Sequence, residues 1–189
     1  MRYKEFNRNS VLEKCIPLFW ATGFRACAIS DIVEETGVNR FSLYEEFDNK
    51  EGILYAALEL YKERYAQANF DVLKKEGTPH EILFQFFNSF LNGKQQDGCF
   101  IMHVGTELAD NDSKVQTFLK TYMDEIEQLF VQLLEKDSET KADSAFYARN
   151  LIGLFCTSVS FCLIHPTEKR ERHIKNGIQV ILNKKLNHA

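Results

Sequence analysis

The sequence predicts an all-α protein with an N-terminal three-helix bundle and a larger C-terminal helical domain. Apolar side chains recur at three- and four-residue spacing along most of the chain, and no segment alternates as a strand would. Only three Pro and nine Gly occur in 189 residues, which leaves room for long helices. Helix start and stop residues stand at the ends of the periodic segments.

Residues 28–50, AISDIVEETGVNRFSLYEEFDNK, predict two short helices joined by a tight turn. We expect Ser30 to cap the first helix and Gly37 to end it in a left-handed conformation. A second helix is expected to begin near Asn39, with Leu43 and Phe47 on its inner side. This is the layout of a helix-turn-helix, whose second helix enters the major groove of DNA.

The surrounding residues resemble the N-terminal domain of TetR-family transcriptional regulators. The residues that carry this resemblance are Val11-Leu12, Leu18-Phe19-Trp20, Gly23-Phe24, Ile32-Val33, Gly37-Val38-Asn39-Arg40, Ser42-Leu43-Tyr44, Phe47 and Asn49-Lys50-Glu51. Further on, Gly98-Cys99-Phe100 with Glu107-Leu108-Ala109 and Asp112 is similar to a subset of that family. The resemblance implies a homodimer that binds a palindromic operator and releases it when a small molecule enters the C-terminal domain.

The residues expected to contact duplex DNA lie in and beside the second helix: Ser30, Asn39, Arg40, Phe41, Ser42, Tyr44, Glu45 and Lys50. Phe41 and Glu45 depart from the family, which mostly has Gly at the first position and often a neutral residue near the second. Both should project outward, one turn apart. The ring would pack on a thymine methyl and the carboxylate would accept from a cytosine amino group, although Phe41 could also be an ordinary exposed apolar residue.

The charge balance is the main objection to this interpretation. Residues 1–52 hold seven Lys or Arg against nine Asp or Glu, a net charge of −2, and the whole chain carries −4. A basic domain is the usual footprint of a nucleic-acid-binding protein. We expect Lys4, Arg8, Arg40 and Lys50 to face the duplex, with helix N-termini and hydroxyl groups supplying more of the phosphate contacts than usual.

The predicted division is a DNA-binding domain over residues 1–52 and a ligand-binding and dimerisation domain over residues 53–189. One long helix is expected from Lys50 to about Lys75, with Gly77 as its stop. Thr78-Pro79-His80-Glu81 predicts a capped start for the next helix. Further helices are expected over residues 99–109, 114–136, 142–163 and 167–186.

The last two helices carry small and apolar residues together, which is typical of close helix packing. Because the resemblance implies a four-helix interface here, we expect dimer contacts from Ala148, Ile152, Phe155, Val159, Ile174, Gly177, Ile178 and Ile181. The alternative is that these residues form an ordinary core within one chain.

Aromatic residues on the helices that surround the family's central cavity are candidates for an effector site. They are, with two polar neighbours, Phe84, Phe87, Phe100, His103, Glu107, Phe118, Tyr122, Phe146 and Phe155. An aromatic residue at helical spacing is also the ordinary content of a core. His103 and Glu107 share a helix face and are expected to hydrogen-bond to each other, because two ligands without a third make a poor metal site.

The sequence lacks the motifs of catalysis, cofactor binding and metal binding. There is no Gly-rich phosphate loop and no Gly-x-Ser-x-Gly, and the five His are scattered. The five Cys are not paired as in a zinc site and are expected to be reduced, although Cys99 could sense redox state. No apolar run or N-terminal signal indicates a membrane or export, so a cytoplasmic protein is expected. The alternative function is a helical small-molecule-binding protein that has lost sequence-specific DNA binding.

Overall fold

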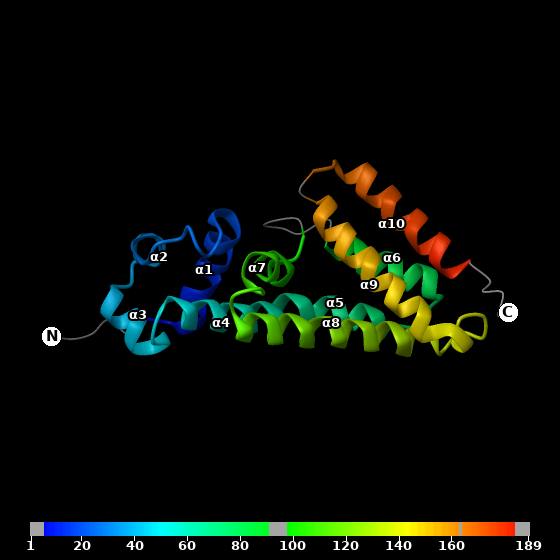
Figure 1. The fold of residues 1–189 in the computed structure, drawn as a ribbon, viewed down its shortest axis with the longest axis horizontal. Coiled ribbons are helices and arrows are strands. Elements are labelled where there is room, and N and C mark those ends of the chain that lie inside the picture. Colours follow the sequence, from blue (N-terminus) through cyan, green and yellow to red (C-terminus); the bar gives the residue numbers. More distant parts are fainter. Residues whose placement is uncertain (1–5, 91–97, 163, 184–189) are drawn as a thin grey trace. The chain divides into compact units, whose positions relative to one another are not determined.

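The computed structural model describes residues 6–90, 98–162 and 164–183, and within them all regular structure is helical (Figure 1). The predicted all-α class is confirmed. Within these ranges no helix is both long and apolar enough to cross a membrane. The chain forms two compact units, Met1–Ala66 with Phe100–Leu119, and Gln67–Cys99 with Lys120–Ala189.

The first unit holds the N-terminal helices and a helix from the middle of the chain. Its helices are α1 (Arg8–Thr22), α2 (Ile29–Thr36), α3 (Arg40–Phe47), α4 (Lys50–Tyr61), the π-helical turn η1 (Lys62–Ala66), α7 (Phe100–Leu108) and the start of α8 (Ser113–Leu134). α1 packs against α2, α4 and α7. Leu12, Phe19, Ile32 and Ile53 are fully buried where these helices meet.

The second unit is built from the remaining helices. They are α5 (Gln67–Leu73), α6 (Pro79–Ser89), the rest of α8, the 3₁₀ turn η2 (Lys141–Asp143), α9 (Ser144–Phe161) and α10 (Thr167–Leu182). α9 and α10 lie side by side, and α10 also contacts α6 (Figure 1). Its core is a cluster of rings in which Phe86 meets Phe87, Phe90, Phe130 and Phe155 at centroid distances of 5.2–6.0 Å.

Helix boundaries follow capping residues in most cases. The Asn39 side chain accepts a hydrogen bond from the Ser42 amide (2.9 Å) and starts α3, as predicted. Thr78 and Glu81 form the expected capping box at the start of α6. Gly37 adopts the left-handed conformation (φ 73°) that ends α2. The predicted Ser30 cap is wrong, because α2 begins at Ile29 and the Asp31 carboxylate accepts from the Ala28 amide (2.8 Å).

The long helix predicted from Lys50 to about Lys75 contains an interruption. α4 and α5 are joined through the π-helical turn η1, and the two compact units separate between Ala66 and Gln67, where that turn ends. Gly77 follows with a φ of 144°, the expected stop. These units are defined by packing, and the functional division after residue 52 stays a prediction.

Candidate nucleic-acid interface

α3 presents one face to the core of the first unit and the other to solvent. Leu43 and Phe47 are buried against the neighbouring helices, as their spacing predicted. Asn39, Arg40, Phe41 and Glu45 are exposed, and Phe41 is 62% exposed. The outward direction predicted for Phe41 and Glu45 is therefore confirmed, while their contacts with bases stay a prediction.

Two more candidates lie at the edges of this face. Ser30, in the first turn of α2, is exposed. Tyr44 is half-buried, and the Arg40 guanidinium lies 5.0 Å from the centroid of its ring. A cation stacked on an aromatic ring loses conformational freedom before it meets a phosphate or a base. This pair is therefore partly ordered in the free protein.

Ser42 and Lys50 do not occupy the predicted DNA-contacting surface. Ser42 is only 8% exposed, so its side chain is largely covered in the folded chain. The Lys50 ammonium donates to the carbonyl oxygens of Phe24 (2.9 Å) and Cys27 (2.8 Å). It also lies 4.3 Å from the centroid of the Phe24 ring. Lys50 therefore serves the interior of the unit, so its predicted side-chain contact with phosphate is corrected.

Glu107 of α7 bonds to the connection between α1 and α2, the segment that also holds Phe24 and Cys27. Its two carboxylate oxygens accept from the backbone amides of Phe24 (2.9 Å) and Arg25 (2.8 Å). The expected hydrogen bond between Glu107 and His103 is thus replaced by bonds to the backbone. The pairing could not be found in the sequence because 83 positions separate Glu107 from Phe24.

A second polar link in this unit joins α4 to the turn before α8. The Tyr55 hydroxyl donates to Asp112 Oδ2 (2.8 Å), and Asp112 Oδ1 accepts from the amides of Lys114 and Val115. Burial and the neighbouring carboxylate raise the pKa of Tyr55 to about 12. Burial alone would raise the pKa of Asp112, but the hydrogen bonds that it accepts lower it. Tyr55 therefore stays protonated and Asp112 stays ionised at neutral pH.

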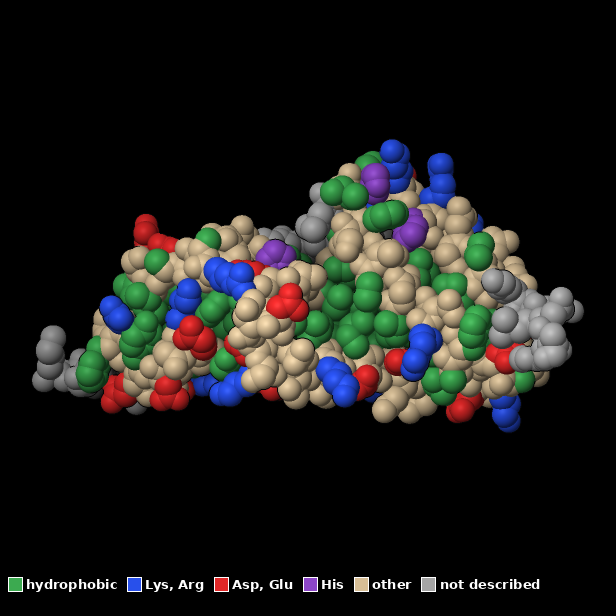
Figure 2. Space-filling view, viewed as in Figure 1, with side chains coloured by type: hydrophobic (Ala, Val, Ile, Leu, Met, Phe, Trp, Pro, Cys, Tyr) green, Lys and Arg blue, Asp and Glu red, His purple; other side chains and the backbone are tan. Residues whose placement is uncertain are grey.

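The cations near α3 are largely engaged with the protein itself. Arg8 pairs with Glu46 of α3 (3.2 Å), and the Lys14 ammonium donates to the Glu35 carbonyl at the end of α2 (2.9 Å). Lys4, a further expected contact, lies outside the described residues. Figure 2 shows acidic and basic side chains interspersed over the visible face of the first unit. Of the cations expected to face the duplex, Arg40 is therefore the main remaining candidate for a contact with DNA.

The thiols of the first unit are buried. Burial raises the pKa of Cys15 to about 12 and also raises the pKa of Cys27. Protonated, inaccessible thiols react slowly. Cys99, in the second unit, is buried as well, with its sulfur 3.6 Å from the Tyr122 hydroxyl.

The residues predicted for dimer contact divide into two groups. Ala148, Phe155, Ile174 and Ile178 are buried within the second unit, so these four are corrected to core residues. The half-buried remainder is Ile152, Val159, Gly177 and Ile181. A Cβ on Gly177 would meet Leu154 Cδ1 at 2.5 Å, so this glycine lets α10 approach α9 in the same chain.

Three exposed apolar residues of α9, of α10 and of the segment between them are not among the residues predicted for dimer contact. Phe146, Ile164 and Val180 keep 44%, 68% and 69% of their surface accessible. A Cβ on Gly153 would meet nothing within 4 Å. Their signal in the sequence was present but ambiguous, because core and interface positions of an apolar helix share one period.

Four of the nine residues predicted for ligand binding are core residues. Phe87, Tyr122 and Phe155 are fully buried in the second unit, and Phe100 is fully buried in the first. Rings fill the space around them, as in the contacts of Phe70 with Tyr122 and of Phe87 with Phe130. In the first unit Glu107 is bonded as above, and two candidates there are half-buried, His103 and Phe118. Phe146 is exposed instead of enclosed.

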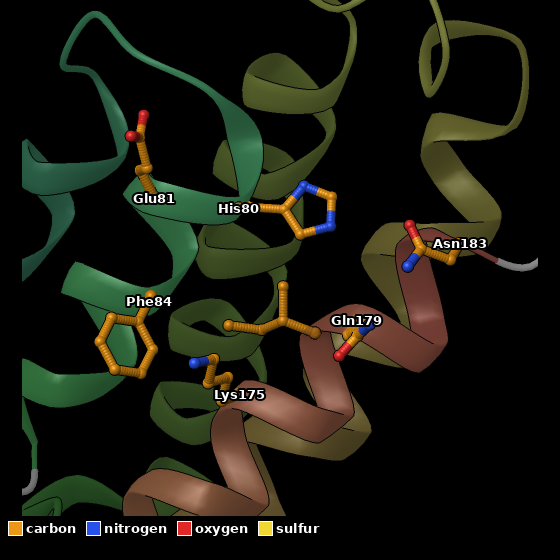
Figure 3. Close-up of a pocket in the computed structure, with 7 residues that line it drawn as sticks. His80, Glu81, Phe84, Lys175, Gln179 and Asn183 are labelled. Atoms are coloured by element: carbon orange, nitrogen blue, oxygen red, sulfur yellow. The ribbon is translucent and has the colours of Figure 1, made fainter.

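Phe84 is the predicted ligand residue that lines a described pocket. This pocket lies between α6 and α10 in the second unit and has a volume of about 440 Å³ (Figure 3). Its walls are His80, Glu81, Phe84, Lys175, Ile178, Gln179 and Asn183. The Glu81 carboxylate is held by the Thr78 hydroxyl (2.8 Å), and hydrogen bonds from Thr78 lower its pKa. Within the described residues, no group of three His, Cys, Asp or Glu side chains could hold a metal ion.

Comparisons with known proteins agree with a helix-turn-helix in this part of the chain. Residues 12–64 match the family model of bacterial regulatory proteins of the tetR family, a range that includes α2 and α3. This N-terminal region is similar to the TetR family. The match begins within α1 and ends within the π-helical turn η1. It therefore covers the helix-turn-helix and the helix that follows it.

Individual relatives extend the TetR-family comparison beyond this region. The transcriptional repressor ComR of Escherichia coli K12 is 33% identical over 125 residues, which are 64% of this chain and 60% of ComR. A cysteine mutant of the TetR-family regulator CifR, solved with 26-bp double-stranded operator DNA, superposes with a TM-score of 0.83 at 19% identity, covering 94% of this chain and 98% of CifR. SCO4454 of Streptomyces coelicolor gives 0.82 at 17% identity, covering 93% and 87%. The structural matches establish the fold.

Proposed function

We propose that this protein is a transcriptional repressor that binds a palindromic operator as a homodimer and is released by a small molecule. The observation that carries the proposal is the exposed face of α3, a capped helix that holds Arg40, Phe41 and Glu45 away from the core of a TetR-like domain. Operator binding requires access to DNA, so we expect the protein in the cytoplasm.

The proposed contact surface consists of Ser30, Asn39, Arg40, Phe41, Tyr44 and Glu45. Arg40 and the hydroxyl and amide side chains would position the backbone of the duplex, while Phe41 and Glu45 would read base edges. Selection of bound sequences from random duplexes by the purified protein tests the proposal. An enriched palindrome is the expected result. Equally weak binding to every duplex would contradict it.

The homodimer is proposed to form through the exposed side of α9 and α10. Phe146 of α9 and Val180 of α10 give these helices exposed apolar residues, and Ile164 adds another between them. In a two-fold dimer the two copies of α3 would match half-sites about one helical turn, roughly 34–36 Å, or multiples of it apart.

The proposed effector site is the pocket between α6 and α10. Phe84 and Ile178 give it an apolar surface, and His80, Lys175 and Gln179 bring polar groups around it (Figure 3). This combination suits an organic molecule with an apolar body and an acidic or hydrogen-bonding group. The effector would favour the conformation in which the two recognition helices are badly spaced for an operator.

A small-molecule library, screened first for a rise in melting temperature and then for weaker operator binding, tests this part of the proposal. An effector must produce both changes, because coupling between the two sites is reciprocal. Lys175→Gln should reduce both responses together. A compound that stabilises the protein and leaves operator affinity unchanged would not be the effector.

The acidic balance of residues 1–52 favours one second candidate, a helical ligand-binding protein that has lost DNA recognition. The engagement of Arg8 and Lys50 with the protein itself supports it. Duplex affinity as a function of salt separates the two. Each phosphate contact contributes about −0.9 to the slope of log affinity against log salt, and a protein that has lost DNA recognition would show almost no slope.

A further inference from the structure

Two side chains of opposite charge hold the connection between α1 and α2, residues 23–28. Lys50 at the start of α4 bonds two of its carbonyl oxygens, and Glu107 near the end of α7 bonds two of its amides, with all four distances between 2.8 and 2.9 Å. We call these two residues the connection clamp. Hydrogen bonds to charged groups are the stronger kind, and here both oxygens of one carboxylate are used.

Buried side chains and ring contacts also hold the connection in place. Phe24 and Cys27 are buried, and the Phe24 ring contacts the Phe19 ring at 5.5 Å as well as the Lys50 ammonium. Gly23 begins the connection with a φ of 77°, a conformation that glycine adopts without strain. A Cβ there would lie 3.5 Å from the Glu107 carboxylate oxygens. The connection therefore has one well-defined position between α1, α4 and α7.

The position of this connection decides where the helix-turn-helix lies. The connection ends at Ala28, the cap of α2, and a three-residue turn joins α2 to α3. A displacement of the connection therefore moves both helices. Other polar ties of α2 and α3 to α1 are the exposed bond from Lys14 to Glu35 and the exposed pair of Arg8 with Glu46. Exposed ion pairs are weak and screened by salt.

We propose that Lys50 and Glu107 are positioning residues for operator recognition, which act by fixing the α1–α2 connection and through it the placement of α3. The inference rests on the proposed reading of an operator by α3. Neither residue touches DNA in this role. The Glu107 bonds link α7, a helix from the middle of the chain, directly to the DNA-binding helices.

The salt dependence of binding distinguishes positioning from contact. If Lys50 met a phosphate, its loss would weaken binding to every duplex and reduce the salt slope by about one contact. A positioning residue instead affects specific binding, because base contacts need closer alignment than phosphate contacts do. The two roles therefore predict different results for a duplex without the operator.

The test uses Glu107→Gln and Lys50→Met in the full chain, with Glu127→Gln and Lys74→Met as matched controls. Glu127 and Lys74 each form a surface ion pair in the second unit, with Arg149 and Asp71. For both clamp variants we expect operator affinity to fall by about tenfold or more, the ratio that the loss of one good base contact gives. Affinity and salt slope on a random duplex should stay at wild-type values, as should both properties in the controls.

Amide hydrogen exchange shows whether the clamp has been opened. Glu107→Gln should speed exchange at the amides of Phe24 and Arg25, and operator binding is then measured at a temperature where circular dichroism shows the variant folded. Faster exchange with wild-type operator affinity would overturn the proposal, and so would a reduced salt slope on random duplex for Lys50→Met. If one variant does not fold, the other decides. Wild-type protein without any sequence preference would contradict the proposed function itself.

Discussion

At the scale of single residues, the exposed face of α3 is unusual for a DNA-binding surface. It holds a large ring, Phe41, and a carboxylate, Glu45, beside Arg40. A carboxylate near phosphates is unfavourable unless it accepts a hydrogen bond from a base, and the cytosine amino group is the major-groove donor that Glu usually reads. The pair therefore suits base reading better than backbone contact.

Glu45→Ala is expected to relax base preference at one position in each half-site. The lost contact should reduce discrimination there by about 1–3 kcal/mol, because that is the usual worth of a good base contact. Phe41→Ala should lower affinity most for operators with thymine at the contacted step. Repeating the sequence selection with both variants measures this. An unchanged preference with uniformly higher affinity for Glu45→Ala would mean that the carboxylate only borders the groove.

At the scale of elements, glycine sets how closely α9 and α10 pack. A Cβ on Gly177 would be within 3.3 Å of three atoms of Leu154, so the whole buried side chain stands in its way. Overpacking costs about 1–3 kcal/mol, and the helix preference of alanine returns about 1 kcal/mol. Gly177→Ala should therefore lower the free energy of unfolding by about 1 kcal/mol.

Gly153→Ala on the neighbouring helix is the matched control, because its Cβ would enter open space. It should raise the free energy of unfolding by up to about 1 kcal/mol. Urea denaturation of both variants at one protein concentration makes the comparison. Equal effects of the two substitutions would mean that the approach of α10 to α9 does not depend on Gly177.

The elements were predictable from local signals, and the site only in part. Asn39, Gly37 and the Thr78-Pro79 start act within a few residues of themselves, so the sequence shows them directly. The π-helical turn at Lys62–Ala66 leaves the apolar period almost unchanged and was not foreseen. The bonds of Lys50 and Glu107 could not be predicted, because their partners are backbone groups, which no residue type reveals.

At the scale of the whole molecule, operator recognition should depend on dimerisation. One α3 offers few contacts, and a second copy on the same duplex binds at a high effective concentration, which raises affinity by about 10²–10⁴. An exposed apolar residue of α10, Val180, makes this dependence testable. Val180 is 69% exposed there, whereas Gln179 beside it lines the pocket toward α6 of the same chain.

Val180→Asp is therefore expected to give a monomer, because a charge buried at an interface without a partner is strongly unfavourable. Its affinity for the full palindrome should fall by about 10² or more, while affinity for an isolated half-site stays at the wild-type value. Gln179→Asp is the control and should remain dimeric. Sedimentation velocity gives the oligomeric state, and titration of full and half operators gives the affinities. A Val180→Asp protein that stays dimeric would place the interface elsewhere, and a monomer that binds the palindrome as tightly as wild type would remove dimerisation from recognition.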